Sequence, residues 1–159
     1  MGERVDGLVA RLRKGGRKTT EIFGSLGNAQ WEMTLYEGPP TWTVRDLLAH
    51  FLSAEEGLRR VGQDIAAGGP GAPGDLDYDE YNATEQTRLA GLPPRELLAN
   101  LEAAREATVA WVMGLEEAGL DRTGRHPALG EITLETLINA IYGHQLMHVR
   151  DLQSLLRVE

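Results

Sequence analysis

Apolar side chains recur at alternating steps of three and four residues along most of the chain, which is the period of helices with one buried face. This pattern predicts a first helix over residues 4–27. A second helix is expected to begin at Thr43, because Thr43 and Asp46 form a T-x-x-D start signal, and to end at the Pro/Gly loop 69–75. The first of these two helices is thus predicted from periodicity, and the second is also delimited by local signals at both ends.

Two further helices follow the polar segment 76–91, "LDYDEYNATEQTRLAG", which is expected to form a short helix or lid. Pro93 and Pro94 open the third long helix, since proline is tolerated in a first turn. Thr133 caps the fourth, whose apolar positions include two histidines near its middle. Four long helices that each bear one apolar stripe bury those stripes best against one another.

The chain is therefore expected to be all-α, a four-helix bundle over one domain of residues 1–159. Its long connections allow crossovers in place of a simple up-and-down order, and no strand-like alternation of any length competes. Trp111 is expected in the core, whereas Trp31 and Trp42 fit either a core or an interface.

The balance of acidic and basic residues argues against nucleic-acid binding. There are 24 acidic and 16 basic residues, a net charge of -8, and a negative field of this kind repels nucleic-acid phosphates. The basic run of the first helix is interpreted as a solvated face: Arg11, Arg13, Lys14, Arg17 and Lys18. We therefore expect no nucleic-acid partner.

The chain has no cysteine, which excludes disulfides, cysteine zinc sites and a protein thiol nucleophile. The sequence shows no apolar signal segment and no run long enough to span a membrane. A cytoplasmic protein without a membrane partner is expected.

Candidate chemistry lies in "GHQLMH" of the last helix. His144 and His148 are four residues apart, so they project from one helix face, about 40° apart around the axis. His148 is predicted on the core seam with His144 beside it. A buried imidazole must satisfy its N–H and its lone pair, and two neighbouring rings can do so by sharing a divalent metal. On spacing alone, core histidines with ordinary hydrogen bonds are the more frequent case.

A third imidazole, His50, lies at the edge of the apolar stripe of the second helix. Three histidines on facing helices would bind a metal and leave coordination positions open, although His50 could instead point to solvent. His126, in "RHPALG", is interpreted as a loop residue. Gln145 replaces the glutamate of H-E-x-x-H, and no glutamate lies three residues before a histidine, so zincin and ferritin-like di-iron sites are disfavoured.

These segments resemble a known family. "WTVRDLLAHFLSAEE" and, about ninety residues later, "HPALGEITLETLINAIYGHQLMHVRDL" are similar to the DinB/YfiT-like damage-inducible four-helix bundles, and the resemblance extends over essentially the whole chain. It implies that His50, His144 and His148 bind a divalent metal, commonly nickel or zinc. Family members include bacillithiol- and mycothiol-dependent transferases and isomerases, and homodimers are common among them.

The leading hypothesis is a metal-dependent transferase that acts on a small molecule with an external low-molecular-weight thiol. The metal would lower the pKa of the thiol, which must come from outside a chain that lacks cysteine. Metal-assisted hydrolysis and a non-catalytic metal-binding or stress-response bundle are the alternatives. Asp151 could support His148, but a surface ion pair is the favoured role, and no catalytic residue is assigned.

Overall fold

The computed structural model describes residues 2–158 and is about 70% helical. Its elements in chain order are α1 (Glu3–Gly24), α2 (Asn28–Trp31), β1 (Thr34–Tyr36), β2 (Trp42–Thr43), α3 (Val44–Ala66), α4 (Tyr78–Leu89), α5 (Pro94–Met113), the 3-10 helix η1 (Glu117–Asp121), β3 (Thr123–His126), β4 (Gly130–Thr133) and α6 (Leu134–Arg157). The expected all-α four-helix bundle is confirmed, with α1, α3, α5 and α6 as its long helices.

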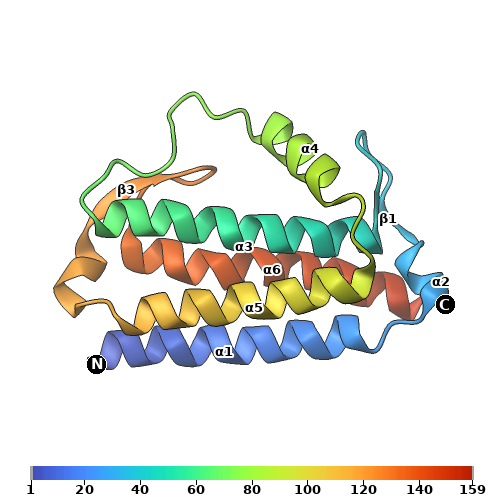
Figure 1. The fold of residues 1–159 in the computed structure, drawn as a ribbon, viewed down its shortest axis with the longest axis horizontal. Helices are drawn as coiled ribbons and strands as arrows, with labels where there is room; N and C mark the ends of the chain where they lie inside the picture. The colour runs from blue at the N-terminus through green and yellow to red at the C-terminus, as the bar shows by residue number, and fades with distance from the viewer. Residues whose placement is uncertain (1, 159) are drawn as a thin grey trace.

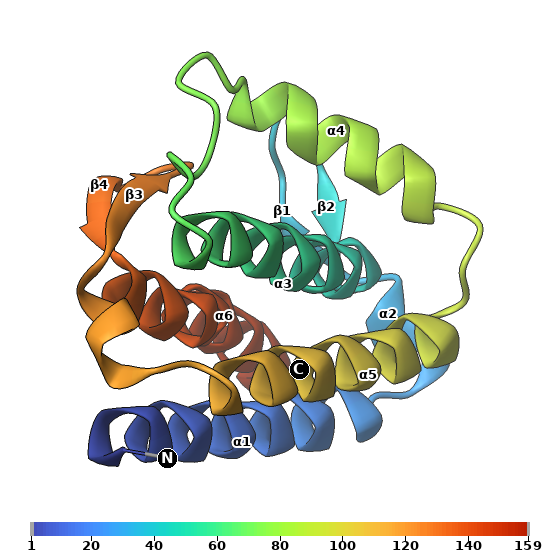
Figure 2. The ribbon, with the colours of Figure 1, turned by 60° about the vertical axis from the view of Figure 1, so that its left-hand side comes forward.

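The order of the helices around the bundle requires long connections. α1 and α3 each contact both α5 and α6. In Figure 1, α3 and α5 run in one direction, and α1 and α6 run in the opposite one. Parallel neighbours cannot be joined by a tight turn, so the chain returns from α3 to α5 through α4, which lies across α3 (Figures 1 and 2). The expected crossover connections are thus present.

Local signals set the helix boundaries as predicted. Thr43 Oγ1 accepts a hydrogen bond from the Asp46 N–H, and the Asp46 carboxylate accepts one from the Thr43 N–H. Thr133 caps α6 through the N–H of Thr136. Within α1, glycine at position 15 allows a close approach to α6, because a Cβ on Gly15 would lie only 2.2 Å from the Tyr142 ring.

Two short antiparallel hairpins were not predicted. β1 pairs with β2, and β3 pairs with β4. Each strand has only two to four residues, too few for apolar alternation to show in the sequence. Both hairpins precede a long helix that carries histidines, and β1 and β2 contact α6 and α3 respectively. The β1–β2 hairpin therefore packs against both α3 and α6.

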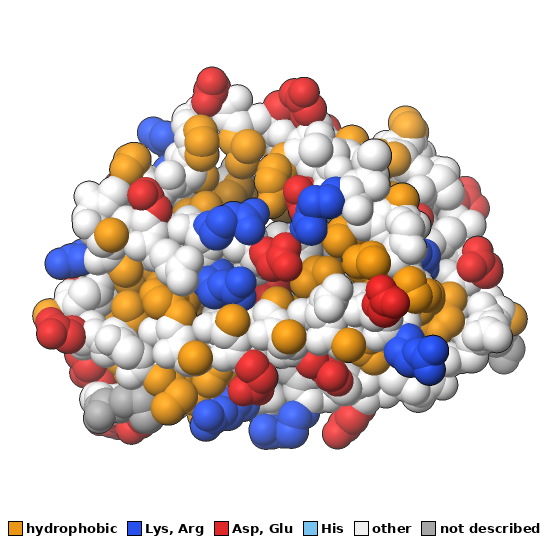
Figure 3. Space-filling view, viewed as in Figure 1, with side chains coloured by type: hydrophobic (Ala, Val, Ile, Leu, Met, Phe, Trp, Pro, Cys, Tyr) orange, Lys and Arg blue, Asp and Glu red, His pale blue; other side chains and the backbone are white. Residues whose placement is uncertain are grey.

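The surface mixes both signs of charge. Figure 3 shows Lys and Arg side chains interspersed with Asp and Glu on one face of the molecule. All five side chains of the basic run on α1 are exposed, as expected for a solvated face. No helix within residues 2–158 combines the length and the hydropathy needed to cross a membrane.

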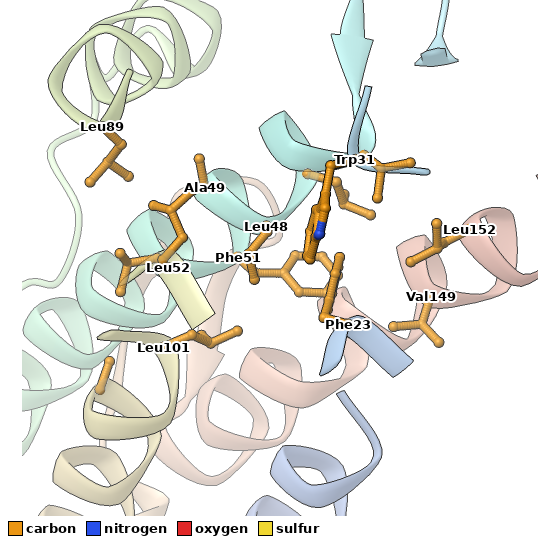
Figure 4. Packing of buried hydrophobic residues seen from close by; sticks show 14 residues of the cluster. Phe23, Trp31, Leu48, Ala49, Phe51, Leu52, Leu89, Leu101, Val149 and Leu152 are labelled. Atoms are coloured by element: carbon orange, nitrogen blue, oxygen red, sulfur yellow. The ribbon is translucent and has the colours of Figure 1, made fainter. Parts of the chain in front are cut away.

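The apolar core has two clusters. One contains Phe23, Trp31 and Phe51, with the Trp31 ring stacked on Phe23 at 5.7 Å and Phe51 edge-on to Phe23 at 5.6 Å (Figure 4). The other is built on Val5, Leu8 and their neighbours at the opposite end of the bundle. Trp31 is thus a core residue, whereas Trp111 is partly buried against the second cluster.

A buried polar layer lies between the clusters. Arg105 donates to both carboxylate oxygens of Glu55, at 2.7 and 2.9 Å, and to the carbonyl of Leu12. The Gln145 amide donates to Glu55 and accepts from Arg105. Because Thr19 of α1 also contacts the Gln145 oxygen, side chains of all four long helices meet here. We call Thr19, Glu55, Arg105 and Gln145 the polar layer.

Candidate metal centre

The structure brings the three predicted histidines together where α3 and α6 face each other. The Nε2 atoms of His50 and His144 are 3.0 Å apart. The centroid of the His148 ring lies 5.4 Å from that of His50 and 4.8 Å from that of His144. One ring nitrogen from each residue lies within 4.8 Å of the other two. The three rings thus form a compact cluster, here called the His triad.

Burial keeps these rings neutral. His50 is 3% exposed, and the other two are partly buried. Desolvation, reinforced by the neighbouring imidazoles, lowers the pKa of His50 to about 3 and that of His144 to about 4. The pKa of His148 is also lowered by burial, although the Asp151 charge opposes this shift. Neutral imidazoles present the lone pairs that metal coordination requires.

The geometry of the His triad fits a divalent cation. Two nitrogens bound to one tetrahedral zinc at about 2.0–2.1 Å would lie roughly 3.3 Å apart, and the two Nε2 atoms already stand at a similar separation. His144 Nδ1 is buried with no hydrogen-bond partner among the described residues. Within the described part of the chain, the two facing Nε2 atoms have only each other as partners, and they are the donor pair that a metal ion would complete. With Nε2 as ligand, His144 Nδ1 carries the proton of the neutral ring.

Tyr36 orients one of the three rings. Its hydroxyl donates to Asp151 Oδ2 at 2.5 Å, so its oxygen is free to accept from His148 Nδ1–H at 2.7 Å. This arrangement places the His148 proton on Nδ1 and leaves the Nε2 lone pair for coordination. The favoured surface ion pair of Asp151 is wrong: its described partner is Tyr36. Sequence reasoning missed Tyr36, because only the β1–β2 hairpin brings it to α6.

Aromatic rings form the walls of the His triad. Trp42 of β2 lies 4.8 Å from the His50 ring, and Phe51 lies 6.1 Å from that of His148. The prediction that His148 occupies the core seam is wrong. Gln145 and Val149 are the buried residues of α6 here, at 1% and 2% exposure, whereas His148 is only partly buried and lines a cavity.

A cavity of about 660 Å³ opens beside His148. It lies between the β1–β2 connection, the start of α3 and one side of α4, so the predicted lid segment does cover this face. The polar side chains among its lining residues are Tyr36, Thr41, Arg45, Asp46, Asp79, Asn82, Gln86 and Thr87. The size suits a small-molecule ligand that reaches the His triad from this side.

His126 lies outside the His triad, at the end of β3. Its Nδ1 accepts hydrogen bonds from the N–H groups of Ala128 and Leu129, each at 3.0 Å. Burial lowers its pKa. A ring nitrogen that accepts two N–H groups carries a lone pair and no proton, so His126 shapes the β3–β4 turn. The interpretation of His126 as a loop residue is wrong, because it is the last residue of β3 and pairs with Gly130, but it does lie outside the candidate ligand set.

Comparison with known proteins places the fold. A model of the DinB superfamily matches residues 11–152, nearly the whole chain. The chain belongs to the DinB superfamily. A comparison with curated proteins gives no match.

Solved structures agree with the membership in the DinB superfamily. YfiT from Bacillus subtilis, described as a probable metal-dependent hydrolase with an unusual four-helix bundle topology, is similar with a TM-score of 0.79 and 17% identity, over 99% of this chain and 89% of YfiT. A mycothiol-dependent maleylpyruvate isomerase is similar with a TM-score of 0.74 and 19% identity, over 96% of this chain and 63% of the isomerase. A four-helix bundle protein, TT2238, has a TM-score of 0.64 and 22% identity, over 96% and 98% of the two chains. At these identities the likeness concerns the fold.

Proposed function

We propose that this DinB-superfamily protein binds a divalent metal, nickel or zinc, through His50, His144 and His148. The observation that carries the proposal is the convergence of three neutral imidazoles, with two Nε2 atoms 3.0 Å apart. The cluster of potential ligands contains no carboxylate or further histidine among the described residues. Three protein ligands leave at least one position free on a four-coordinate ion, the pattern of catalytic sites.

We further propose that the reaction is a transfer to or from a low-molecular-weight thiol, of the bacillithiol or mycothiol type. A divalent cation in the His triad would supply Lewis acidity that favours the thiolate form of a bound thiol. The chain supplies no sulfur nucleophile of its own, because it has no cysteine. The similarity to a mycothiol-dependent isomerase supports this choice.

The residues around the His triad have separate tasks in this proposal. Tyr36 and Asp151 hold His148 with its Nε2 toward the site. Trp42 and Phe51 exclude water from the inner side of the rings. The cavity beside His148 binds and orients the polar part of the thiol through the amides and hydroxyls of its rim.

Metal-assisted hydrolysis is the second candidate, because YfiT is described as a probable metal-dependent hydrolase. A hydrolase needs a base for its water, and the nearest carboxylate to His148 in these contacts, Asp151, already accepts the Tyr36 proton. A non-catalytic metal-binding or stress-response bundle is the third candidate. The cytoplasmic location, the homodimer and the single-domain organisation stay predictions.

Metal analysis of the purified protein beside His148→Ala tests the metal site. We expect close to one divalent ion per chain in the native protein and a large loss in the variant. His126→Ala is the matched control, since it removes an imidazole outside the His triad. Equal metal in the native protein and His148→Ala would overturn the assignment.

Titration with bacillithiol and mycothiol then separates the candidate reactions. Saturable, metal-dependent thiol binding supports the transferase. Metal without thiol affinity, together with turnover of esters or amides, supports the hydrolase. Metal with neither thiol affinity nor turnover supports the non-catalytic bundle.

A further inference from the structure

A second cavity of about 290 Å³ lies on the outer side of α3, below α4. Its floor is formed by Ser53, Ala54 and Gly57, and its cover by Tyr78, Tyr81 and the loop before α4. Figure 3 shows a hollow edged by hydrophobic side chains in this part of the molecule. We call this space the apolar cavity, and no role in metal or thiol binding accounts for it.

The apolar cavity adjoins the His triad along α3. Ala54 follows His50 by four residues and therefore lies on the same helix face, about 6 Å further along the axis. The Ser53 hydroxyl donates to the carbonyl of His50, so it is already satisfied and the floor offers no free polar group there. Asn82 of α4 lines both this cavity and the larger one beside His148. The floor of the apolar cavity thus begins one helical turn from His50 along α3.

The space exists because the residues of its floor are small. A Cβ on Gly57 would stand 2.8 Å from the Tyr81 hydroxyl, closer than such contacts allow. The Tyr81 hydroxyl also lies 3.5 Å from Arg60 Nη2, which holds the ring over the cavity. Glycine at this position therefore lets the aromatic cover approach the helix and still leaves a hollow.

The far wall depends on the β3–β4 turn. Pro127 lines the cavity, and the preceding residue, His126, accepts the N–H groups of Ala128 and Leu129. These bonds fix the turn that carries Pro127. Two segments that lie far apart in the sequence, the α4 region and the hairpin, thus close one space over α3.

The lining indicates the chemistry of the occupant. Tyr78, Tyr81, Leu76, Pro127 and the small floor residues give a mainly apolar wall, and the charged group at its edge, Arg60, contacts the Tyr81 hydroxyl. The volume equals that of roughly ten waters at about 30 Å³ each, which suits a single substituted ring. Apolar walls with aromatic faces favour an uncharged ring over a charged group.

We propose that the apolar cavity binds the small uncharged part, of the size of one aromatic ring, of the electrophilic substrate that reacts at the His triad. The role of the apolar cavity as a substrate site rests on the proposed function. Binding of a ring to the cavity is a separate property of the fold, so the two can fail independently.

The test uses 4-fluorotoluene as probe and fluorine NMR as readout, on the full chain with and without added zinc. We expect saturable binding in both states. Ala54→Leu fills the floor and should weaken binding at least tenfold, and Leu76→Trp should do the same from the loop side, so the test survives if one variant does not fold. Ala99→Leu, on the exposed face of α5, is the matched control and should bind like the native protein.

Absence of saturable binding to the native protein overturns the proposal. Undiminished affinity in both Ala54→Leu and Leu76→Trp also overturns it, because the probe would then bind elsewhere. The variant His148→Ala should lose the metal and still bind 4-fluorotoluene. This result supports ring binding in the apolar cavity independently of the metal assignment. Conversely, if the native protein contains the metal but does not bind 4-fluorotoluene, the proposed role of the apolar cavity is rejected. The proposed function is not affected by that outcome.

Discussion

His144 and Gln145 are consecutive residues of α6 with opposite surroundings. The Gln145 amide is 1% exposed and hydrogen-bonded to Glu55 and Arg105 in the polar layer. The His144 ring points its Nε2 toward that of His50 on α3, and its Nδ1 has no described partner. Gln145 thus completes a closed hydrogen-bond network, whereas His144 leaves one ring nitrogen without a partner among the described residues.

The difference separates a structural cluster from a candidate site. Buried polar groups are normally satisfied, and a satisfied network such as the polar layer holds helices in one arrangement. The His triad instead gathers neutral lone pairs beside a cavity, at a cost in desolvation. Groups kept in that state are available to a ligand. The following experiments disturb each cluster in turn.

Arg105→Met should have the largest effect, a loss of about 3–5 kcal/mol in the free energy of unfolding, because it leaves Glu55 buried and unpaired. Urea unfolding of metal-free protein measures it. The double variant Glu55→Leu with Arg105→Met removes both charges and should recover most of the loss. A single variant as stable as the native chain would contradict a structural role for the polar layer.

Added zinc should stabilise the native protein by about 2.7 kcal/mol when the free ion exceeds its dissociation constant a hundredfold. Thermal unfolding with and without zinc gives this value. His144→Ala should lose the gain, whereas Gln145→Leu, one residue away, should keep it even though its starting stability is lower. If both variants lose the gain, the two clusters are not independent.

Tyr36→Phe should weaken metal affinity by about 10- to 100-fold, because His148 loses the hydrogen bond that fixes its tautomer. Competition with a metal-binding dye measures the affinity. Tyr142→Phe is a matched control on α6, since the Tyr142 hydroxyl makes no hydrogen bond among the described contacts. An unchanged affinity in Tyr36→Phe would show that the Asp151–Tyr36 pair has no influence on the site.

Acidification should destabilise the metal-free protein. The folded-state pKa values of His50 and His144 lie below that of an unfolded histidine, near 6.5, so their contribution is present above that pH and is lost as the pH falls. Between pH 7.5 and 5.5 the loss is about 1.4 kcal/mol for each such histidine. Between these two pH values the native chain should lose about 1.4 kcal/mol more of its free energy of unfolding than His144→Asn does, and urea unfolding measures the difference. Equal pH dependence would contradict a neutral, buried His144.

Helices with strong local signals could be predicted from the sequence. Thr43 with Asp46, and Thr133, mark helix starts because their capping bonds form within four residues. Pro94 marks the start of α5 because proline is tolerated in a first turn. The three histidines could also be singled out, from the spacing of two of them and from the family resemblance. The assignment of His148 to the core seam was wrong, because neighbouring seam positions on a helix cannot be ranked without its packing partners.

The sequence by itself determined which segments become helices and which residue types could hold a metal, since both depend on local periodicity and side-chain chemistry. The tertiary structure alone decided which faces meet. It placed Gln145 in the polar layer, turned His144 and His148 toward His50, and brought Tyr36 to His148 through strands too short to show a pattern. Contacts between residues about a hundred positions apart depend on the packing of whole helices, and no local signal encodes them.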